Sequence, residues 1–588
     1  MNIANSKMTW GTTLVFVVCA YLFFYGIYPF HVCYQEQYQL FLFSSAYTSE
    51  MLSKPGGLAE YIAAYLTQFF ISPAAGAFIL AFLLGMLQRL VYTAAKSLGA
   101  DDKFYPLTFL PSLFYWMLLC NENYMLVGLV APILALTLYP LSAKGPRLWA
   151  IYYILMPLGL YFFVGISCWI WFILWFAYEW KERQWPRRVF LAFAGWNLLA
   201  FLLFPLVLKY AGWMYPVQLL FFGTNFFRFP LLGVSSVVIV YMLLIACIPL
   251  LAAWLSAKVR SEGRRAVVLV AVLSLLVFGG CGYLIHRATD MEKEEILAYD
   301  YCIQHRDWKK VIELADRKVP SSPLSVACLN LALCKEGMMA DRMFHYYQNG
   351  TEGLLPSFTK DFTAPLITSE IYYHIGFINT AQRYAFEAME CIPNMNKNVR
   401  VIKRLAETNI INGEYAVARK YLHLLQQTMF YHDWATETLS LLSDEQKVEQ
   451  NEEWRQLRKY RTKKDFLFSE QEPDMMLGFV FSQDETNRVA YEYLMAVCLL
   501  RKDLKSFLQY YPLGKSIGYA RIPESYQEAI VYAWGLQHKD MTGIPYPIDS
   551  NVLNRVNAYG RIYTSYANAE PMLRQQYSGT YWYYLHFR

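Results

Sequence analysis

Long apolar runs dominate the first half of this 588-residue chain. They occupy roughly residues 10–28, 74–94, 104–120, 124–141, 148–180, 189–208, 232–256 and 266–285. Most of them approach the roughly 20 residues that a helix needs to cross the hydrocarbon core of a bilayer. The pattern therefore predicts an all-α fold in which residues 1–288 form a polytopic bundle of transmembrane helices.

The run at 148–180 is too long for one crossing. As a single helix it would measure about 50 Å, against a hydrocarbon core of about 30 Å. Lys144 and Arg147 precede this run and four basic residues follow it, so the positive-inside rule places both of its ends in the cytoplasm. We therefore expect a hairpin that turns near Gly159 to Gly165, which brings the total to nine spans.

Basic residues between the runs are unevenly distributed. With the N-terminus in the cytoplasm, fourteen Lys and Arg fall in cytoplasmic loops and three, Lys54, Lys209 and Arg228, fall in the opposite loops. The first run is long for a signal peptide and no small-x-small cleavage site follows it, so we interpret it as a retained helix. The sequence thus indicates a multi-pass protein of a bacterial inner membrane, with everything after about residue 287 in the periplasm.

From Glu292 onward the pattern changes to helices of 12 to 16 residues joined by short turns. Two segments align closely in sequence at an offset of 37 residues: GFINTAQRYAFEAM from Gly376 and GEYAVARKYLHLL from Gly413. Segments starting at Arg306 and Leu500 have the character of the second helix of the same kind of pair. Such hairpins resemble tetratricopeptide-like repeats, so residues 289–588 are expected to form an α-solenoid. The aromatic ending GTYWYYLHF predicts a buried terminal helix or strand.

Composition follows the same division. Charged residues make up 28 of the first 290 positions and 70 of the remaining 298, against about a quarter in a typical soluble domain. The net charge of +6 resolves into +8 and −2 for the two halves. Because the excess positive charge lies in loops between apolar runs, it indicates membrane orientation and no nucleic-acid partner. The eleven cysteines form no CxxC pair, which favours ordinary packing roles.

The sequence carries few motifs of known chemistry. It contains no GxxxxGK[ST], HExxH or GxSxG motif and no dinucleotide fingerprint, which argues against ATP-driven transport by this chain. No Asp, Glu, Lys or Arg lies near the centre of a predicted span, where Asn197 and the Thr67 and Gln68 pair are the most polar positions. This argues against an ion-coupled transporter, which needs ionisable groups inside the membrane.

The first outer loop, which begins at His31, is the most informative segment. After Gly57 its apolar residues follow helical spacing and make one face of a short helix that ends before Pro73: Leu58, Tyr61, Ile62, Tyr65, Leu66, Phe69 and Phe70. Such a helix is expected to lie in the membrane surface.

Glu36 lies in the same loop, eight residues beyond the first span, with Gln35 and Gln37 on either side. A carboxylate at this boundary could act as a general base on an acceptor hydroxyl, or hold a divalent metal that binds a lipid-linked phosphate. The candidate phosphate contacts are the outer cations Arg228, Lys209 and Arg287, and Glu122 in the CNENY turn is a second candidate acid. A plainer interpretation makes these residues solvated charges, helix caps or cations that reach lipid head groups.

The order of a first span, an acidic outer loop with interfacial helices, many further spans and an outer helical domain resembles the GT-C class of polytopic glycosyltransferases. That class uses an Asp or an adjacent acidic pair early in the first outer loop and a lipid-linked sugar donor. Glu36 in YQEQY matches that position, although the adjacent acidic pair is absent. The resemblance implies a transferase of envelope glycan metabolism in which Glu36 is the acid, the base or a metal ligand.

In its sequence the chain more closely resembles a family of uncharacterised integral membrane proteins common in Bacteroidetes. It rests on YPFHVCYQEQYQLFLFSS, on KPGGLAEYIAAYLTQFF and on GTYWYYLHF, and that family has no established activity. Two functions therefore stay open from the sequence. One is a GT-C-like transferase whose solenoid binds a glycan acceptor, and the other is a non-enzymatic scaffold whose solenoid recruits a periplasmic protein.

Overall fold

The computed structural model describes residues 2–139, 149–182, 186–211, 217–223, 236–259, 263–359, 361–392, 397–462, 468–538, 541 and 543–588. Within these ranges the chain folds into helices joined by turns, without strands, so the predicted all-α class is confirmed. Its internal contacts divide it into two compact units. The first unit comprises Met1–Glu294, Ile392–Val399 and Gln427–Phe430, and the second comprises Glu295–Cys391, Arg400–Gln426 and Tyr431–Arg588.

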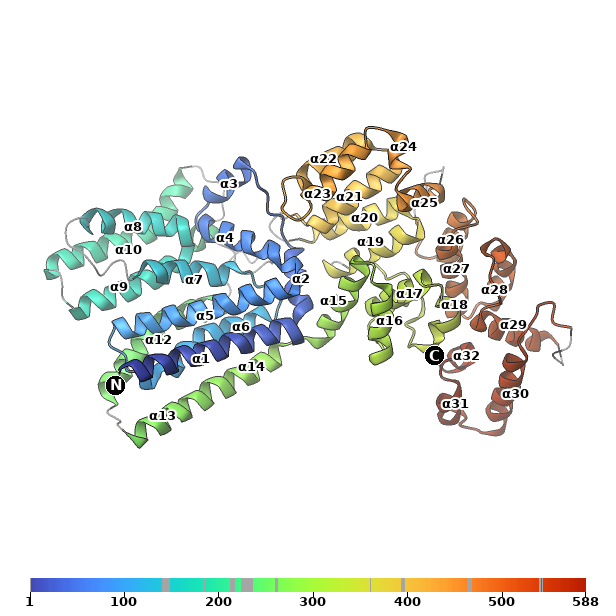
Figure 1. Ribbon diagram of the computed structural model, residues 1–588, viewed down its shortest axis with the longest axis horizontal. Coiled ribbons are helices and arrows are strands. Elements are labelled where there is room, and N and C mark those ends of the chain that lie inside the picture. Colours follow the sequence, from blue (N-terminus) through green and yellow to red (C-terminus); the bar gives the residue numbers. More distant parts are fainter. Residues whose placement is uncertain are drawn as a thin grey trace. The chain divides into compact units, whose positions relative to one another are not determined.

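The first unit is built around long apolar helices (Figure 1). In chain order they are α1 (Asn2–Leu22, extended by a π-helical turn at Phe23–Ile27), α2 (Pro29–Glu36), α3 (Ser45–Leu52), α4 (Gly57–Thr67), α5 (Pro73–Ser97), α6 (Leu110–Leu119), α7 (Val127–Leu138), α8 (Trp149–Val164), α9 (Cys168–Glu182), α10 (Arg187–Tyr210), α11 (Val217–Phe222), α12 (Ser236–Lys258), α13 (Arg264–Ser274) and α14 (Gly280–Ala288).

Six helical segments among the described residues are long and apolar enough to cross a membrane: Lys7–Ile27, Pro73–Ser97, Ile154–Glu182, Arg187–Tyr210, Ser236–Lys258 and Arg264–Ala288. The predicted run at 148–180 breaks between Val164 and Cys168, where Gly165 adopts a φ of +55°. The predicted runs at 104–120 and 124–141 form shorter α-helices, α6 and α7. In the first run a 3-10 helix at Asp102–Phe109 precedes α6.

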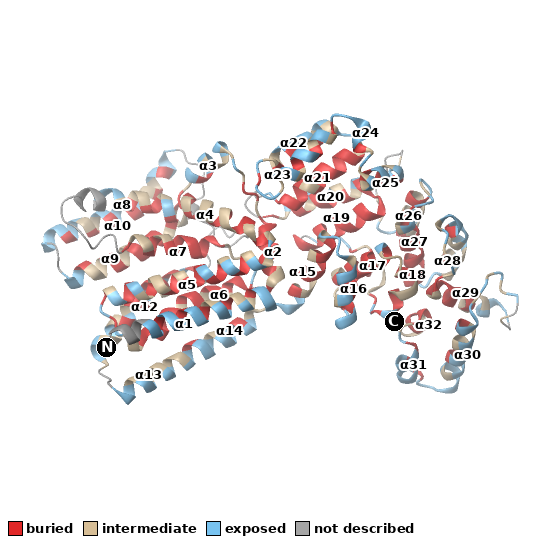
Figure 2. Cartoon of the chain, in the orientation of Figure 1, coloured by how far each residue is buried: buried red, intermediate tan, exposed pale blue. Residues whose placement is uncertain are grey.

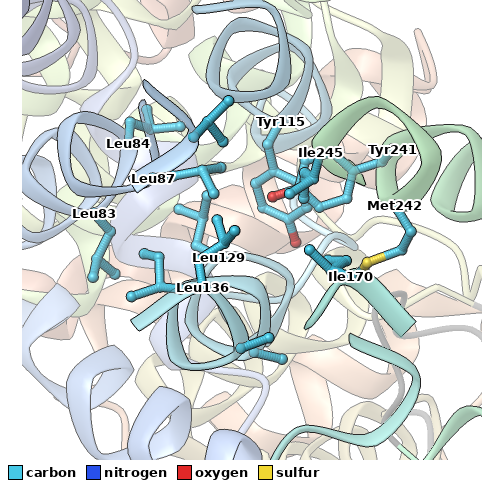
Figure 3. Packing of buried hydrophobic residues seen from close by; sticks show 14 of the residues in the cluster. Leu83, Leu84, Leu87, Tyr115, Leu129, Leu136, Ile170, Tyr241, Met242 and Ile245 are labelled. Carbon is cyan, nitrogen blue, oxygen red and sulfur yellow. The ribbon is translucent and has the colours of Figure 1, made fainter. Parts of the chain in front are cut away.

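The core of the first unit lies where α5, α6, α7, α9 and α12 meet (Figure 3). Between helices in lipid the apolar driving force is weak, so close packing and hydrogen bonds carry the association. A buried network does this for α1 and α5: the Thr13 hydroxyl donates to Gln88 Oε1 at 2.9 Å, and Gln88 Nε2 donates to Thr108 Oγ1 at 2.9 Å. Figure 2 shows the contrast between the buried faces of α5 and α7 and the exposed surface of α13 and α14.

The second unit consists of shorter helices. These are α15 (Met291–Gln304, whose first turn lies in the first unit), α16 (Trp308–Arg317), α17 (Pro323–Lys335), α18 (Met339–Arg342), α19 (Thr363–Ile375), α20 (Ile378–Glu390), α21 (Val399–Asn412), α22 (Tyr415–Leu425), α23 (His432–Leu441), α24 (Glu445–Val448), α25 (Glu452–Tyr460), α26 (Pro473–Phe481), α27 (Arg488–Leu500), α28 (Leu504–Tyr510), α29 (Glu524–Gln537), α30 (Ser550–Ser565), α31 (Glu570–Tyr577) and α32 (Tyr581–Phe587). The aromatic C-terminus forms the predicted buried helix, because Tyr581 to Tyr584 on α32 are buried.

One turn recurs between helices of the second unit. A residue with left-handed φ stands two positions before the next helix at Arg306, Gly337, Gly376, Gly413 and Lys502. In each case the following amide donates to the carbonyl five residues earlier, at 2.7 to 3.0 Å (Asp307 to Cys302, Met338 to Leu333, Phe377 to Tyr372, Glu414 to Asn409, Asp503 to Cys498). This hydrogen bond is the signature of a Schellman helix end. The first four of these positions, 306, 337, 376 and 413, are 31, 39 and 37 residues apart.

A buried ion network joins α15, α19 and α21 inside the second unit. The Arg400 guanidinium contacts both carboxylate oxygens of Asp300 at 2.9 and 2.8 Å, and Arg404 contacts Glu370 at 2.5 Å. Burial by itself raises the pKa of Glu370, but Arg404 and Arg400 outweigh it and lower that pKa to about 2. Removal of one partner from such a network is strongly destabilising because it leaves a buried charge without its counterion.

Candidate functional site

The site is built on α2, the short helix that follows α1 directly (Figure 1). Pro29 occupies its first turn, where a missing amide hydrogen has no structural consequence. Six of its eight residues, His31 to Glu36, are buried. Gly76 on α5 permits the close approach, because a Cβ at that position would lie 2.5 Å from Cγ1 of Val32. The ionisable side chains of this helix, including those of His31 and Glu36, are therefore buried in the protein interior just after a candidate membrane span.

Glu294, in the first turn of α15, anchors the start of α2. Its carboxylate accepts hydrogen bonds from the backbone amides of Phe30 at 2.8 Å and His31 at 3.0 Å. These amides belong to the first helical turn, where they have no partner within the helix. A carboxylate at this place also interacts favourably with the positive end of the helix dipole. Glu294 therefore caps α2 from a position more than 260 residues away in the chain.

The same carboxylate holds the His31 imidazole. His31 Nδ1 lies 2.6 Å from Glu294 Oε2, and His31 Nε2 lies 3.7 Å from Oε2 of Glu122 in the turn after α6. His31 is 1% exposed, whereas the Glu122 side chain is 16% exposed. The imidazole therefore lies between a buried carboxylate and one that reaches the surface.

Tyr28 completes the surroundings of His31. The two rings stack with centroids 4.1 Å apart, and the Tyr28 oxygen lies 3.1 Å from His31 Nε2. The Tyr28 hydroxyl donates to the carbonyl of Cys120 at 2.8 Å and accepts from the amide of Asp290 at 3.0 Å. Burial raises the pKa of Tyr28 well above its usual range, so its hydroxyl keeps its hydrogen at any physiological pH.

Glu36 lies at the C-terminal end of α2 and is 7% exposed. Burial raises the pKa of its carboxyl to about 8. Burial is the only cause of this shift, and no hydrogen bond or charge of a described residue offsets it. Burial, with the charges of Glu294 and Glu36 nearby, also raises the pKa of Cys33 to about 12, so Cys33 is a neutral thiol. A buried carboxyl without a counterion is unfavourable for folding, and such groups concentrate at functional sites.

Two further short helices, α3 and α4, follow α2, and the second of them is the one that the loop pattern predicts. Ser44 caps α3 by accepting from the amide of Tyr47. On α4 the face of small residues, with Ala59, Ala63 and Ala64, is buried, whereas bulky residues of the predicted apolar stripe such as Tyr61 and Tyr65 are only half-buried. Ile62 and Leu66 pack against the core of the first unit and Tyr61 and Tyr65 pack against Phe41, so the location of this helix in the membrane surface stays a prediction.

The structure brings together some of the sequence-predicted residues. Gln35 and Gln37 are buried beside Glu36, and Glu122 lies next to His31. Lys209 and Arg287 are exposed in the last turns of α10 and α14. Arg228 lies outside the described residues. Within the described part of the chain, no group of three or more His, Cys, Asp or Glu side chains is arranged to hold a metal ion.

Sequence reasoning missed three residues that the structure makes prominent. His31 lies in the same short segment as Glu36 and could have been noticed by that proximity. Glu294 could not, because only the fold brings it to α2. Glu179 on α9 is 3% exposed, and neither of its carboxylate oxygens has a hydrogen-bond partner among the described residues. It lies at the end of an apolar run, where a sequence pattern indicates an ordinary interfacial charge.

Comparisons with known proteins identify a family, but they do not indicate a function. Neither the curated proteins nor the solved structures contain a match to this chain. Residues 6–588 match the family of unknown function DUF6057. The match covers nearly the whole sequence and therefore includes α2, the six candidate spans and the helices of the second unit. The chain belongs to the family of unknown function DUF6057.

Proposed function

We propose that this protein is a membrane-embedded glycosyltransferase that moves a sugar from a lipid-linked donor to an acceptor hydroxyl. The observation that carries the proposal is Glu36, a buried carboxyl whose pKa is raised by burial with no offsetting charge or hydrogen bond from a described residue, on the helix that directly follows the first candidate span. Its neighbours in the sequence, Tyr34, Gln35, Gln37 and Tyr38, are also buried and offer flat apolar faces and amides. Such side chains suit a sugar, which offers hydroxyls at its edges and apolar faces above and below the ring.

In this mechanism Glu36 is the general base. Its carboxylate takes the proton from the acceptor hydroxyl as the acceptor oxygen bonds to the anomeric carbon. The bond from that carbon to the donor phosphate oxygen breaks, and the lipid phosphate leaves with the electron pair. A pKa of about 8 suits this role, because a base works best when its pKa lies near the operating pH. Lys209 and Arg287 are the described cations proposed to approach the phosphate.

The proposal includes nine spans, an N-terminus in the cytoplasm and a periplasmic second unit, in the manner of the GT-C class. It divides the chain into a transmembrane domain at 1–288 and a periplasmic domain at 289–588. The break at Gly165 supports two crossings at 148–180, and the bias of basic residues supports the orientation. A reporter fused after residue 300 should be active only in the periplasm. Activity of that fusion only in the cytoplasm would overturn the orientation.

We further propose that the second unit is a tetratricopeptide-like solenoid that binds the glycan acceptor. The recurring Schellman turn and its spacing near that of such repeats support this view. The same repeats also favour the alternative, a non-enzymatic scaffold whose solenoid binds a periplasmic protein.

The test compares Glu36→Gln with a matched control, Glu50→Gln. Both residues lie in the first outer loop, but the Glu50 side chain is 70% exposed. Full-length protein in lipid vesicles is supplied with isotopically labelled polyprenyl-phosphate sugars and a periplasmic glycan fraction, and transfer is followed by mass spectrometry. We expect transfer by wild type and E50Q and a loss of about 100-fold or more in E36Q.

Two results would reject the transferase. One is an equal rate in wild type and E36Q when both fold and insert normally. The other is an E36Q strain with intact envelope glycans while deletion of residues 300–588 abolishes function, which would favour the scaffold.

A further inference from the structure

Met429 and Phe430 are two neighbouring apolar residues whose side chains are exposed. They belong to the segment Gln427–Phe430, which lies between α22 and α23 in the chain but packs as part of the first unit. Met429 is 41% exposed and Phe430 is 43% exposed. Contiguous apolar surface of this kind is unfavourable in water and marks a place where a protein meets a partner or a membrane.

Two contacts fix this segment to the first outer loop. The backbone amide of Phe43 donates to the carbonyl of Gln427 at 2.7 Å. The rings of Phe69 and Phe430 meet edge to face with their centroids 5.6 Å apart. Phe69 lies in the 3-10 helix Gln68–Ile71, which follows α4 directly. The late segment is therefore held against the end of α4.

Further rings extend this surface along α4. The Tyr65 ring lies 5.6 Å from that of Phe69 and 6.4 Å from that of Phe43. Phe43 is 50% exposed, whereas Tyr65 and Phe69 are half-buried. We call these three residues, together with Met429 and Phe430, the aromatic patch.

The aromatic patch lies in uncharged stretches of the sequence. Residues 37–49, 61–88 and 421–432 contain no Asp, Glu, Lys or Arg. These three ranges include every residue of the patch. Lipid interiors exclude charged side chains, and tyrosine is enriched where a protein crosses the polar boundary of a bilayer. The composition therefore favours lipid as the occupant.

The position of Phe69 sets the depth of the patch relative to a bilayer. Pro73, four residues later, begins the candidate span Pro73–Ser97. This helix of 25 residues measures about 38 Å, against a hydrocarbon core of about 30 Å, so its ends reach the polar boundary. The short connection keeps Phe69 within about 10 Å of Pro73. Because Phe430 packs on Phe69, it lies near the same boundary.

We propose that the aromatic patch contacts the bilayer surface at which Pro73–Ser97 begins, with Met429 and Phe430 reaching the upper acyl chains. Apolar side chains at this depth gain free energy when they leave water. The chain would thus touch the membrane at a second place, well after the last candidate span, Arg264–Ala288. The inference needs only that Pro73–Ser97 crosses the bilayer, and it does not rest on the proposed transferase.

The first experiment asks whether Phe430 faces lipid, water or protein. A single 4-fluorophenylalanine, which keeps the ring apolar, replaces Phe430 in full-length protein in nanodiscs of phosphatidylethanolamine and phosphatidylglycerol. The ¹⁹F signal is broadened by dissolved oxygen, which concentrates in lipid, and by chelated nickel, which stays in water. The same label replaces two controls, Phe82 on α5, 54% exposed, and Tyr566 after α30, 52% exposed.

We expect position 430 to resemble Phe82, with a ratio of oxygen to nickel broadening at least about threefold above that of position 566. A ratio equal to that of position 566 would place Phe430 in water and overturn the proposal. Weak broadening by both reagents would overturn it as well, because protein would then cover the ring.

The second experiment identifies the occupant directly. The photoreactive p-benzoylphenylalanine replaces Phe430 in the same nanodiscs, and mass spectrometry identifies its adducts after illumination. We expect adducts with acyl chains, whose mass increases when the lipids carry deuterated chains, and none at the control position Tyr566. Adducts only with a second copy of the chain, or equal lipid adducts at both positions, would overturn the proposal. Neither experiment uses transferase activity, so its results leave the test of Glu36 unaffected.

Discussion

Replacement of Glu36 by Gln should make the stability of the first unit less dependent on pH. The folded chain keeps the Glu36 proton up to a pKa of about 8, because burial disfavours the charged form, whereas the unperturbed value is 4.5. Between these values the folded state binds more protons than the unfolded state, so stability falls as pH rises. Gln at this position is neutral at every pH and carries no such loss.

The size of this effect follows from the two pKa values. The interval from 4.5 to about 8, at about 1.36 kcal/mol per pH unit, gives about 5 kcal/mol of stability that wild type loses and E36Q keeps. Since Glu36 is 7% exposed, solvent screening removes little of it. For a unit of this size the difference corresponds to roughly 10 °C in melting temperature.

The assay is thermal unfolding in detergent, followed by tryptophan fluorescence from pH 5 to pH 9. Wild type and E36Q should melt at similar temperatures at pH 5, E36Q should melt progressively higher as the pH rises from 5 to about 8, and the difference should stay constant above that pH. E50Q, with its exposed side chain, should follow wild type throughout. An E36Q advantage that is the same at pH 5 and pH 9 would refute the view that Glu36 is a buried carboxyl with a raised pKa.

Two further substitutions test the packing of each unit. Arg400→Met leaves Asp300 and Glu370 buried without their shared cation. It should lower the free energy of unfolding by about 3–5 kcal/mol, and hydrogen exchange should show lost protection in α15, α19 and α21. The control Arg383→Met removes a pair in which Arg383 is 58% exposed and should change protection little. Gly165 has a φ of +55°, and Gly165→Ala places a Cβ 2.6 Å from the carbonyl oxygen of Phe222. This change should destabilise the first unit by about 1–3 kcal/mol in detergent melts. The control Gly159→Ala, within α8 and with no neighbour closer than 3.8 Å, should be neutral or stabilising. Equal effects of the paired variants would contradict the geometry assigned to these positions.

The hydrophobic pattern was enough to predict the helical class and the positions of the long apolar helices of the first unit. Apolar runs of about 20 residues leave few alternatives, and α5, α10 and α12 lie where their runs indicate. The turns at Gly376 and Gly413 were also predictable, because glycine adopts left-handed φ without strain. Arg306 and Lys502 adopt the same turn without glycine, so the recurrence became visible only in the structure.

The candidate site was predictable only in part. Glu36 could be selected from its position after the first span, and the structure adds that it is buried. The His31 cluster could not be assembled, because Glu122 and Glu294 reach it through tertiary packing rather than sequence spacing. Nor could the sequence show that Lys209 and Arg287, the proposed phosphate contacts, are exposed at the ends of α10 and α14. The number of spans, the orientation and the partner of the second unit stay predictions.

The central claim is that Glu36 acts as the base in sugar transfer from a lipid-linked donor. The most direct measurement is the pH dependence of transfer from labelled polyprenyl-phosphate sugars by full-length wild type, E36Q and E50Q. The account predicts that wild type and E50Q gain activity as pH rises, with a midpoint near the pKa of about 8, and that E36Q stays at least about 100-fold slower at every pH. A folded E36Q protein that transfers sugar at the wild-type rate would contradict it.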